Sequence, residues 1–135
     1  MKYSVLLIIS LGLCLSLFSC NKTSEESINL NDETVLAYGT EGIINGSTKL
    51  TWTSVADLRC PKDVNCVSPG NVDVTFDVNE GGQTTKFSLG LLNSVFPAND
   101  TINGYVYTLV NVTPEPDSKN TPKTKDYEVS IVVSQ

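Results

Sequence analysis

A strict alternation of apolar and polar residues runs through the middle of this chain. Apolar side chains occupy every second position from Val72 to Val78, with Asp, Thr, Asp and Asn at the positions that follow them. Period two over eight residues predicts a half-buried strand, because successive side chains of a strand point to opposite faces. A Glu-Gly-Gly-Gln turn follows at 80–83, and residues 84–89 return with Phe87 and Leu89 on one face. Together these segments predict a β-hairpin whose turn glycines can adopt positive φ.

The chain from residue 34 onward carries further strand signals and no window of a dozen residues with a helical stripe. Apolar groups on both faces of residues 105–113 favour an interior position in a sheet. Irregular structure is expected over 90–104, with a short helical turn near 91–95, and over the proline-containing segment 114–125. The remaining predicted strands cover residues 34–38, 42–45, 49–53 around Trp52, and 127–133.

Six or seven short strands with Gly and Pro turns in about 100 residues imply an all-β domain. Our prediction is a small, partly open β-barrel of the oligonucleotide-binding (OB-like) type, and the alternative is an immunoglobulin-like β-sandwich. A sandwich is expected to carry a disulfide between its sheets more often than a local one. The cysteine spacing described below therefore favours the barrel.

The beginning of the chain resembles a bacterial lipoprotein leader. Lys2 precedes an apolar run that ends at Leu17-Phe18-Ser19-Cys20 and turns polar immediately afterwards. The run is shorter than the about 20 residues that a membrane span requires. The four residues resemble a lipobox, in which a small residue precedes the cysteine that receives the lipid. Phe18 and the acidic residues that follow are similar to lipoproteins of Bacteroidota. The alternative is an ordinary cleaved signal peptide.

This resemblance implies the organisation of the whole chain. Residues 1–19 would be a cleaved signal peptide, and Cys20 would become the acylated, palmitate-carrying N-terminus. Residues 20–33 contain few large apolar side chains and are expected to form a flexible tether. Residues 34–135 would form a single β domain at the outer membrane or cell surface, attached to the membrane through the lipid.

Composition excludes several function classes. The formal net charge is −6 and becomes −7 once Lys2 is removed with the leader, so we expect no nucleic-acid partner. The chain has no histidine, which removes Ser-His-Asp catalysis and histidine-based zinc sites. Paired carboxylates could still hydrolyse glycosides, but Asp73 and Asp77 alternate with apolar residues and are expected on a solvated strand face. We therefore predict a monomer without enzymatic activity, cofactor or metal.

Cys60 and Cys66 are the two cysteines that follow the leader and its lipidation site. A single pair in an oxidising compartment predicts a disulfide, and a metal site would need two further soft ligands. The bridge closes a ring of seven residues, which the chain-entropy relation equates with roughly 2.4 kcal/mol. Its main effect is therefore to fix the local shape of one loop, which Pro61 and Pro69 stiffen further.

Two interpretations of this loop remain open. The bridge could merely hold a strand crossing in place, or the loop could be a rigid recognition element that binds without a large ordering cost. Many peptidase inhibitors present such a constrained segment to the cleft of their target. Arg59 or Lys62 would suit a trypsin-like pocket, where an aspartate meets a basic side chain. The candidate inhibitory loop consists of Leu58, Arg59, Cys60, Pro61, Lys62, Asp63, Val64, Asn65, Cys66 and Val67.

The loop sequence also resembles known proteins. Asp57-Leu58-Arg59-Cys60-Pro61, followed by Val64, Cys66 and Gly70, is similar to an Asp-Ser-Arg-Cys-Pro…Cys…Gly pattern in small secreted bacterial β domains. Leu58 replaces the usual serine, and Ser68-Pro69 replaces the usual Trp-Ala. The lipobox, short tether and single small β domain together resemble the potempins, lipoprotein inhibitors with a compact OB-type barrel. This resemblance of architecture implies inhibition of a secreted peptidase, with a metallopeptidase favoured.

The alternative function is a non-inhibitory cell-envelope module, either carbohydrate-binding or structural. Tyr105, Tyr107 and Tyr127 could form a platform that stacks on sugars, although tyrosines at strand spacing more often pack across strands. Residues 100–102, Asp-Thr-Ile, resemble an O-glycosylation motif of secreted Bacteroidota proteins and lie in a predicted loop.

Overall fold

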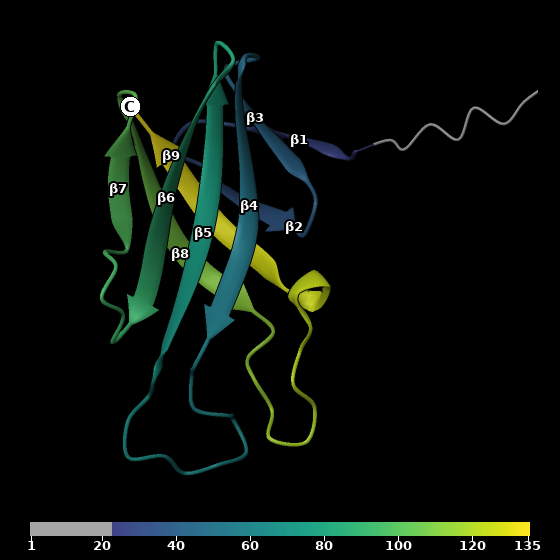
Figure 1. The fold of residues 1–135 in the computed structure, drawn as a ribbon, viewed down its shortest axis with the longest axis vertical. Coiled ribbons are helices and arrows are strands. Elements are labelled where there is room, and N and C mark those ends of the chain that lie inside the picture. Colours follow the sequence, from purple (N-terminus) through teal and green to yellow (C-terminus); the bar gives the residue numbers. More distant parts are fainter. Residues whose placement is uncertain (1–22) are drawn as a thin grey trace, which may run out of the picture.

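The structure is a computed structural model, and it describes residues 23–135; Cys20 and the lipobox lie outside the described residues. Figure 1 shows two layers of strands packed face to face. The elements, in chain order, are β1 (Glu25–Ile28), β2 (Glu33–Ala37), β3 (Glu41–Ile44), β4 (Thr48–Asp57), β5 (Asn71–Glu80), β6 (Gln83–Leu92), β7 (Asn99–Ile102), β8 (Tyr105–Thr113), the 3-10 turn η1 (Thr124–Asp126) and β9 (Glu128–Ser134).

The strands form two separate sheets. One has five strands in the order β1-β3-β4-β5-β6, and the other has four in the order β2-β9-β8-β7. Neighbouring strands are antiparallel except β1 and β3, which pair in parallel. The all-β prediction is confirmed, and the two sheets do not close on each other, an arrangement that fits both a partly open barrel and a sandwich.

The predicted hairpin is confirmed and supplies the centre of the core. The four apolar side chains of β5 are buried, whereas the residues between them are half-buried. Phe76 lies opposite Phe87 of β6, with the rings stacked at 5.4 Å between centroids. The rings of Phe87 and Tyr107 of β8 are also in contact, with 5.2 Å between their centroids. A row of three aromatic side chains therefore joins the two sheets. Such aromatic pairs stabilise a fold beyond the free energy gained by burying their surface.

A second link joins the sheets through Trp52 of β4. Its indole Nε1 donates a buried hydrogen bond to the carbonyl oxygen of Leu36 on β2, at 3.0 Å. The ring of Tyr38 packs edge-on against the indole at 5.0 Å. The inward faces of both sheets thus share one core, whose buried apolar residues are Ile28, Leu36, Ile44, Leu50, Trp52, Val72, Val74, Phe76, Val78, Phe87, Leu89, Tyr105, Tyr107, Leu109, Val112, Tyr127, Val129, Ile131 and Val133.

The predicted tether over residues 20–33 is wrong at its C-terminal end. Strand β1 pairs with β3, and Ile28 is only 3% exposed within the core. Room for Ile28 comes from Gly42, where a Cβ atom would lie 2.4 Å from the Ile28 Cδ1. Burial of Ile28 and pairing with β3 therefore dock a segment of otherwise polar composition.

The predicted helical turn near 91–95 is also wrong. Strand β6 continues to Leu92 because Leu91 stays in register with Val72 and packs against the core. Residues 99–102, expected to be irregular, form the edge strand β7. The expected interior position of residues 105–113 is confirmed, since β8 lies between β9 and β7.

Truncating Ile28 tests whether β1 belongs to the domain. The Ile28→Ala variant is expected to lose about 2 kcal/mol or more of unfolding free energy, because it removes a buried side chain from the core. Urea unfolding followed by circular dichroism measures this loss. The matched control is Ser27→Ala, an exposed neighbour on the same strand, which should change stability by no more than about 0.5 kcal/mol. Equal stability of the two variants would show that β1 does not contribute to the fold.

Candidate functional site

The disulfide loop lies at one end of the molecule, between β4 and β5. Figure 1 places it at the lower end, beside the segment that follows β8 and opposite the C-terminus. Two backbone hydrogen bonds close its base, from the Leu58 N–H to the Asn71 carbonyl at 2.8 Å and from the Cys60 N–H to the Pro69 carbonyl at 2.9 Å. The loop therefore continues the β4–β5 pairing beyond the ends of the strands.

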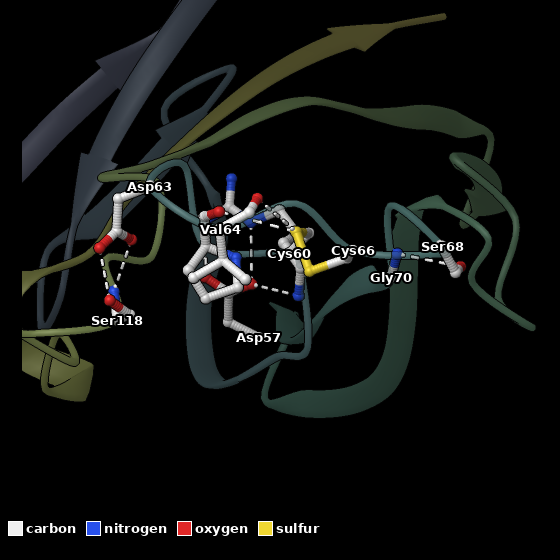
Figure 2. The surroundings of a disulfide bond; sticks show 10 residues. Asp57, Cys60, Asp63, Val64, Cys66, Ser68, Gly70 and Ser118 are labelled. Carbon is white, nitrogen blue, oxygen red and sulfur yellow. Dashed lines mark hydrogen bonds and ion pairs between the residues drawn. A yellow bond between two sulfur atoms is a disulfide. The ribbon is translucent and has the colours of Figure 1, made fainter.

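The predicted disulfide between Cys60 and Cys66 is confirmed, with an S–S distance of 2.07 Å (Figure 2). Inside the ring, the Val64 N–H donates to the Pro61 carbonyl at 3.0 Å and forms a turn. Gly70, on the returning arm, has φ of +73°, and a Cβ atom there would lie 1.9 Å from the Leu58 carbonyl oxygen. Only glycine fits this close approach of the two arms.

Arg59 holds the base of the loop to the neighbouring sheet. Its Nε and Nη2 donate to the two carboxylate oxygens of Asp57, at 2.8 and 2.7 Å. Nη1 donates to the carbonyl of Val112 on β8 at 2.7 Å, and Nη2 also donates to the Pro114 carbonyl at 2.9 Å. The side chains of Arg59 and Asp57 are only 9% and 4% exposed.

This geometry overturns one expectation for Arg59. A residue that enters a trypsin-like pocket must extend its charge away from its own protein. The Arg59 guanidinium is instead committed to internal acceptors and is nearly buried. Lys62, whose side chain is 57% exposed, is the basic residue of the loop that stays accessible.

The ion pair sets the protonation of the groups around it. Burial alone raises the pKa of Asp57, but the hydrogen bonds and charge of Arg59, with a hydrogen bond from Tyr127, lower this pKa below its ordinary value of 3.8. For Tyr127, burial first and then the charge of Asp57 raise the pKa to about 12. The tyrosine therefore remains protonated and donates its O–H to Asp57 Oδ2 at 3.1 Å.

A second set of contacts fixes the outer part of the loop. The Lys62 N–H donates to the Pro116 carbonyl at 3.0 Å. The Asp63 carboxylate accepts hydrogen bonds from the Ser118 N–H, at 2.9 Å, and from the Ser118 hydroxyl (Figure 2). These bonds lower the pKa of Asp63. The exposed ion pair of Lys62 with Asp117, at 3.8 Å, contributes little to stability.

The returning arm of the loop rests on the segment after β6. The Asn93 N–H donates to the Gly70 carbonyl, and the Asn93 Nδ2 donates to the Ser68 hydroxyl, both at 3.3 Å. The loop is thus held from both sides, by residues 112–118 and by Asn93. The sequence did not indicate these partners, because the proline-containing segment 114–125 was predicted only to be irregular.

The loop exposes several apolar side chains. Leu58 is 71% exposed, Val64 is 47% exposed and Val67 is fully exposed. Nearby in the chain after β6, Val95 and Phe96 are exposed as well. Several large exposed apolar side chains on a rigid frame can serve as an interaction surface. The arrangement is suited to binding.

The structure excludes the tyrosine platform. Tyr105, Tyr107 and Tyr127 are 8%, 1% and 5% exposed, so they pack in the core and present no ring face to a sugar. The Asp-Thr-Ile motif at 100–102 lies in strand β7 and not in a loop. Within residues 23–135, no helix is long and apolar enough to cross a membrane, and no cluster of three or more potential metal-ligating side chains occurs.

The expected solvated face of β5 is partly engaged in side-chain contacts. Asp73 accepts hydrogen bonds from the Ser94 hydroxyl and from Asn71 Nδ2. Asp77 pairs with Lys86 at 3.4 Å. The two carboxylates therefore have separate partners, and both fit a structural role.

Comparisons with known proteins give no match: neither a protein-family model, nor a curated protein, nor a solved structure is similar to this chain.

Replacing Gly70 tests the close packing of the loop base. Gly70→Ala is expected to cost at least about 2 kcal/mol of unfolding free energy more than Gly46→Ala, because overpacking adds to the strain of positive φ. Gly46 is the matched control, since its φ is +74° and a Cβ atom there meets nothing within 4 Å. Urea unfolding of both variants measures the difference. Equal losses would contradict the close approach of the two arms.

The buried ion pair predicts a specific dependence on pH. Because the folded pKa of Asp57 is lowered, its contribution to stability is complete above pH 3.8 and is lost as pH falls through the folded pKa. Asp57→Asn should lack this acid-dependent part and should lose about 3 kcal/mol near neutral pH, since it leaves Arg59 without its partner charge. Chemical unfolding between pH 7 and pH 2 measures both effects.

The control for this experiment is Asp117→Asn, which removes an exposed ion pair. It should change stability by no more than about 0.5 kcal/mol and keep the wild-type dependence on pH. If wild type and Asp57→Asn lose stability in parallel below pH 3.8, the ion pair does not have the strength that its geometry indicates.

Proposed function

We propose that this chain is a lipid-anchored cell-surface protein that inhibits a secreted peptidase with its disulfide loop. In this proposal Cys20 carries the lipid, the protein is a monomer without catalytic activity, and residues 58–67 supply the contact with the target. The observation that carries the proposal is the combination of an immobilised loop base with an exposed apolar tip. Val64 and Val67 project from a frame that hydrogen bonds hold on two sides.

Such a frame suits an inhibitor for a physical reason. A loop that is already ordered binds a cleft without losing much conformational entropy. If the target cleaves a bond inside the ring, the Cys60–Cys66 bridge and the contacts to residues 112–118 keep both new ends in place. The products then cannot leave quickly, and the cleft stays occupied.

The residues at the tip favour one kind of target. Since the Arg59 guanidinium forms a nearly buried ion pair with Asp57, binding to a trypsin-like pocket would depend on Lys62 alone. Val64 and Val67 suit a specificity pocket that accepts apolar side chains, and the resemblance to the potempins favours a metallopeptidase. The alternative, a structural module of the cell envelope, would need no such tip; burial of the tyrosines counts against a sugar-binding module.

The proposal predicts stoichiometric inhibition by the purified full chain in mild detergent. We expect residual-activity assays against secreted metallo-, serine and cysteine peptidases to identify one target class, with the loop uncleaved by mass spectrometry. Val67→Asp should weaken inhibition by about tenfold or more, as expected for an apolar residue at the centre of a contact. Val35→Asp is the matched control, because Val35 is 51% exposed on β2 and should leave inhibition unchanged.

Removal of the bridge gives a second test of the same loop. Replacing both Cys60 and Cys66 by serine should abolish inhibition while most of the β-sheet signal in circular dichroism is retained. Inhibition that survives this double replacement would contradict the role given to the loop. Absence of inhibition across all peptidase classes, with the protein folded and the bridge intact, would favour the structural module.

A further inference from the structure

Leu92, the last residue of β6, has a backbone conformation that its side chain disfavours. Its φ is +63°, in the left-handed region. Among residues 23–135, the other non-glycine residues with positive φ are Asn31, Asn45 and Asn103, and asparagine adopts this region at low cost because its short side chain bonds locally. Strained positions of this kind are concentrated at functional sites. A leucine at this position therefore requires an explanation.

The side chain at this strained position is exposed. Leu92 lies on the face of β6 opposite to Leu91 and is 61% exposed. Across from it, on the other sheet, a register shift between Leu109 and Asn111 interrupts the pairing of β8 with β9. The intervening Val110 is 42% exposed. Two irregular positions in different sheets thus carry exposed apolar side chains at the same end of the molecule.

Leu92 and Val110 line one hollow of about 320 Å³. Its floor includes Val72 and Leu91, which belong to the β5–β6 hairpin. The volume is at the lower end of the about 300–1,000 Å³ that is typical of small-molecule sites. A hollow of this small size, bordered by the exposed Leu92 and Val110, suits one or two side chains of a protein segment better than a whole small molecule.

The charges at the hollow define what can bind beside the apolar floor. Arg59 is part of the lining, but Asp57 neutralises its guanidinium. Glu115 is the remaining charged residue of the lining, and none of the ion pairs among residues 23–135 includes it. The hollow therefore has an apolar floor and one uncompensated negative charge.

We propose that this hollow docks a protein segment in which a large apolar side chain lies directly next to a lysine or arginine. The apolar side chain fills the space between Leu92 and Val110, and the basic side chain pairs with the Glu115 carboxylate. Buried apolar anchors of this kind dominate the free energy of protein interfaces, and the adjacent charge supplies selectivity. The inference goes beyond peptidase inhibition and does not depend on it.

Methyl NMR on the full chain in lipid nanodiscs tests the inference with three short probes. They are acetyl-Gly-Leu-Lys-Gly-amide, the same peptide with Glu in place of Lys, and the same peptide with Ser in place of Leu. We expect the Leu-Lys peptide to shift the methyl signals of Leu91, Leu92 and Val110, the Leu-Glu peptide to bind several-fold more weakly, and the Ser-Lys peptide to leave these signals unchanged.

Leu92→Asn separates docking from a structural role. Asparagine tolerates positive φ, so the thermal midpoint should stay equal or rise, whereas affinity for the Leu-Lys peptide should fall by about tenfold or more with the loss of the apolar contact. Glu115→Gln should remove the preference for Leu-Lys over Leu-Glu. Val35→Thr, which removes an exposed apolar group on β2, is the control and should bind as wild type does.

Three results would overturn the inference. They are the absence of methyl shifts with the Leu-Lys peptide, shifts of equal size with the Leu-Glu peptide, and unchanged binding in Leu92→Asn. Since the probes contain no peptidase, these results are independent of the inhibition assays, and a failure of either proposal can be recognised separately.

Discussion

The ion pair of Asp57 with Arg59 is the interaction on which the loop end of this molecule depends. It lies where β4 leaves its sheet, and the guanidinium reaches the backbone of β8 in the opposite sheet. A buried ion pair contributes little net stability compared with an apolar pair of similar size, but removal of one partner is costly. Its main effect here is on geometry, because the hydrogen bonds of Arg59 fix the position at which the loop begins.

The remaining contacts of the loop build on this fixed starting point. Asp63 and the backbone of Lys62 hold the outer part against residues 116–118, and Asn93 supports the returning arm. The Arg59 side chain is thereby directed inward to backbone and side-chain partners, whereas Val64 and Val67 face solvent. Exposed apolar side chains on an ordered frame are the strongest reason to regard this end as a binding site.

Periodicity and cysteine spacing were sufficient to predict the strands of the hairpin and the bridge. The alternation of β5 is a local property that any half-buried strand must have, and two cysteines in one loop have few alternatives. By contrast, β1 was missed because only one of its side chains, Ile28, is buried, and its space depends on Gly42 in another strand. The attachment of Arg59 to the opposite sheet could not be predicted either, since its acceptors at Val112 and Pro114 are more than fifty residues away in the chain.

The two ends of the molecule differ in how they would tolerate additions to the chain. The turns between β3 and β4 and between β5 and β6 lie at the end opposite the disulfide loop (Figure 1), and a Cβ atom at Gly46, Gly81 or Gly82 would meet no other atom within 4 Å. Exposed turns of this kind are where inserted sequence is accepted most readily. A fluorophore or an epitope placed between Gly81 and Gly82 would therefore report on the protein, or attach it to a solid support, with the loop end left free and uniformly oriented.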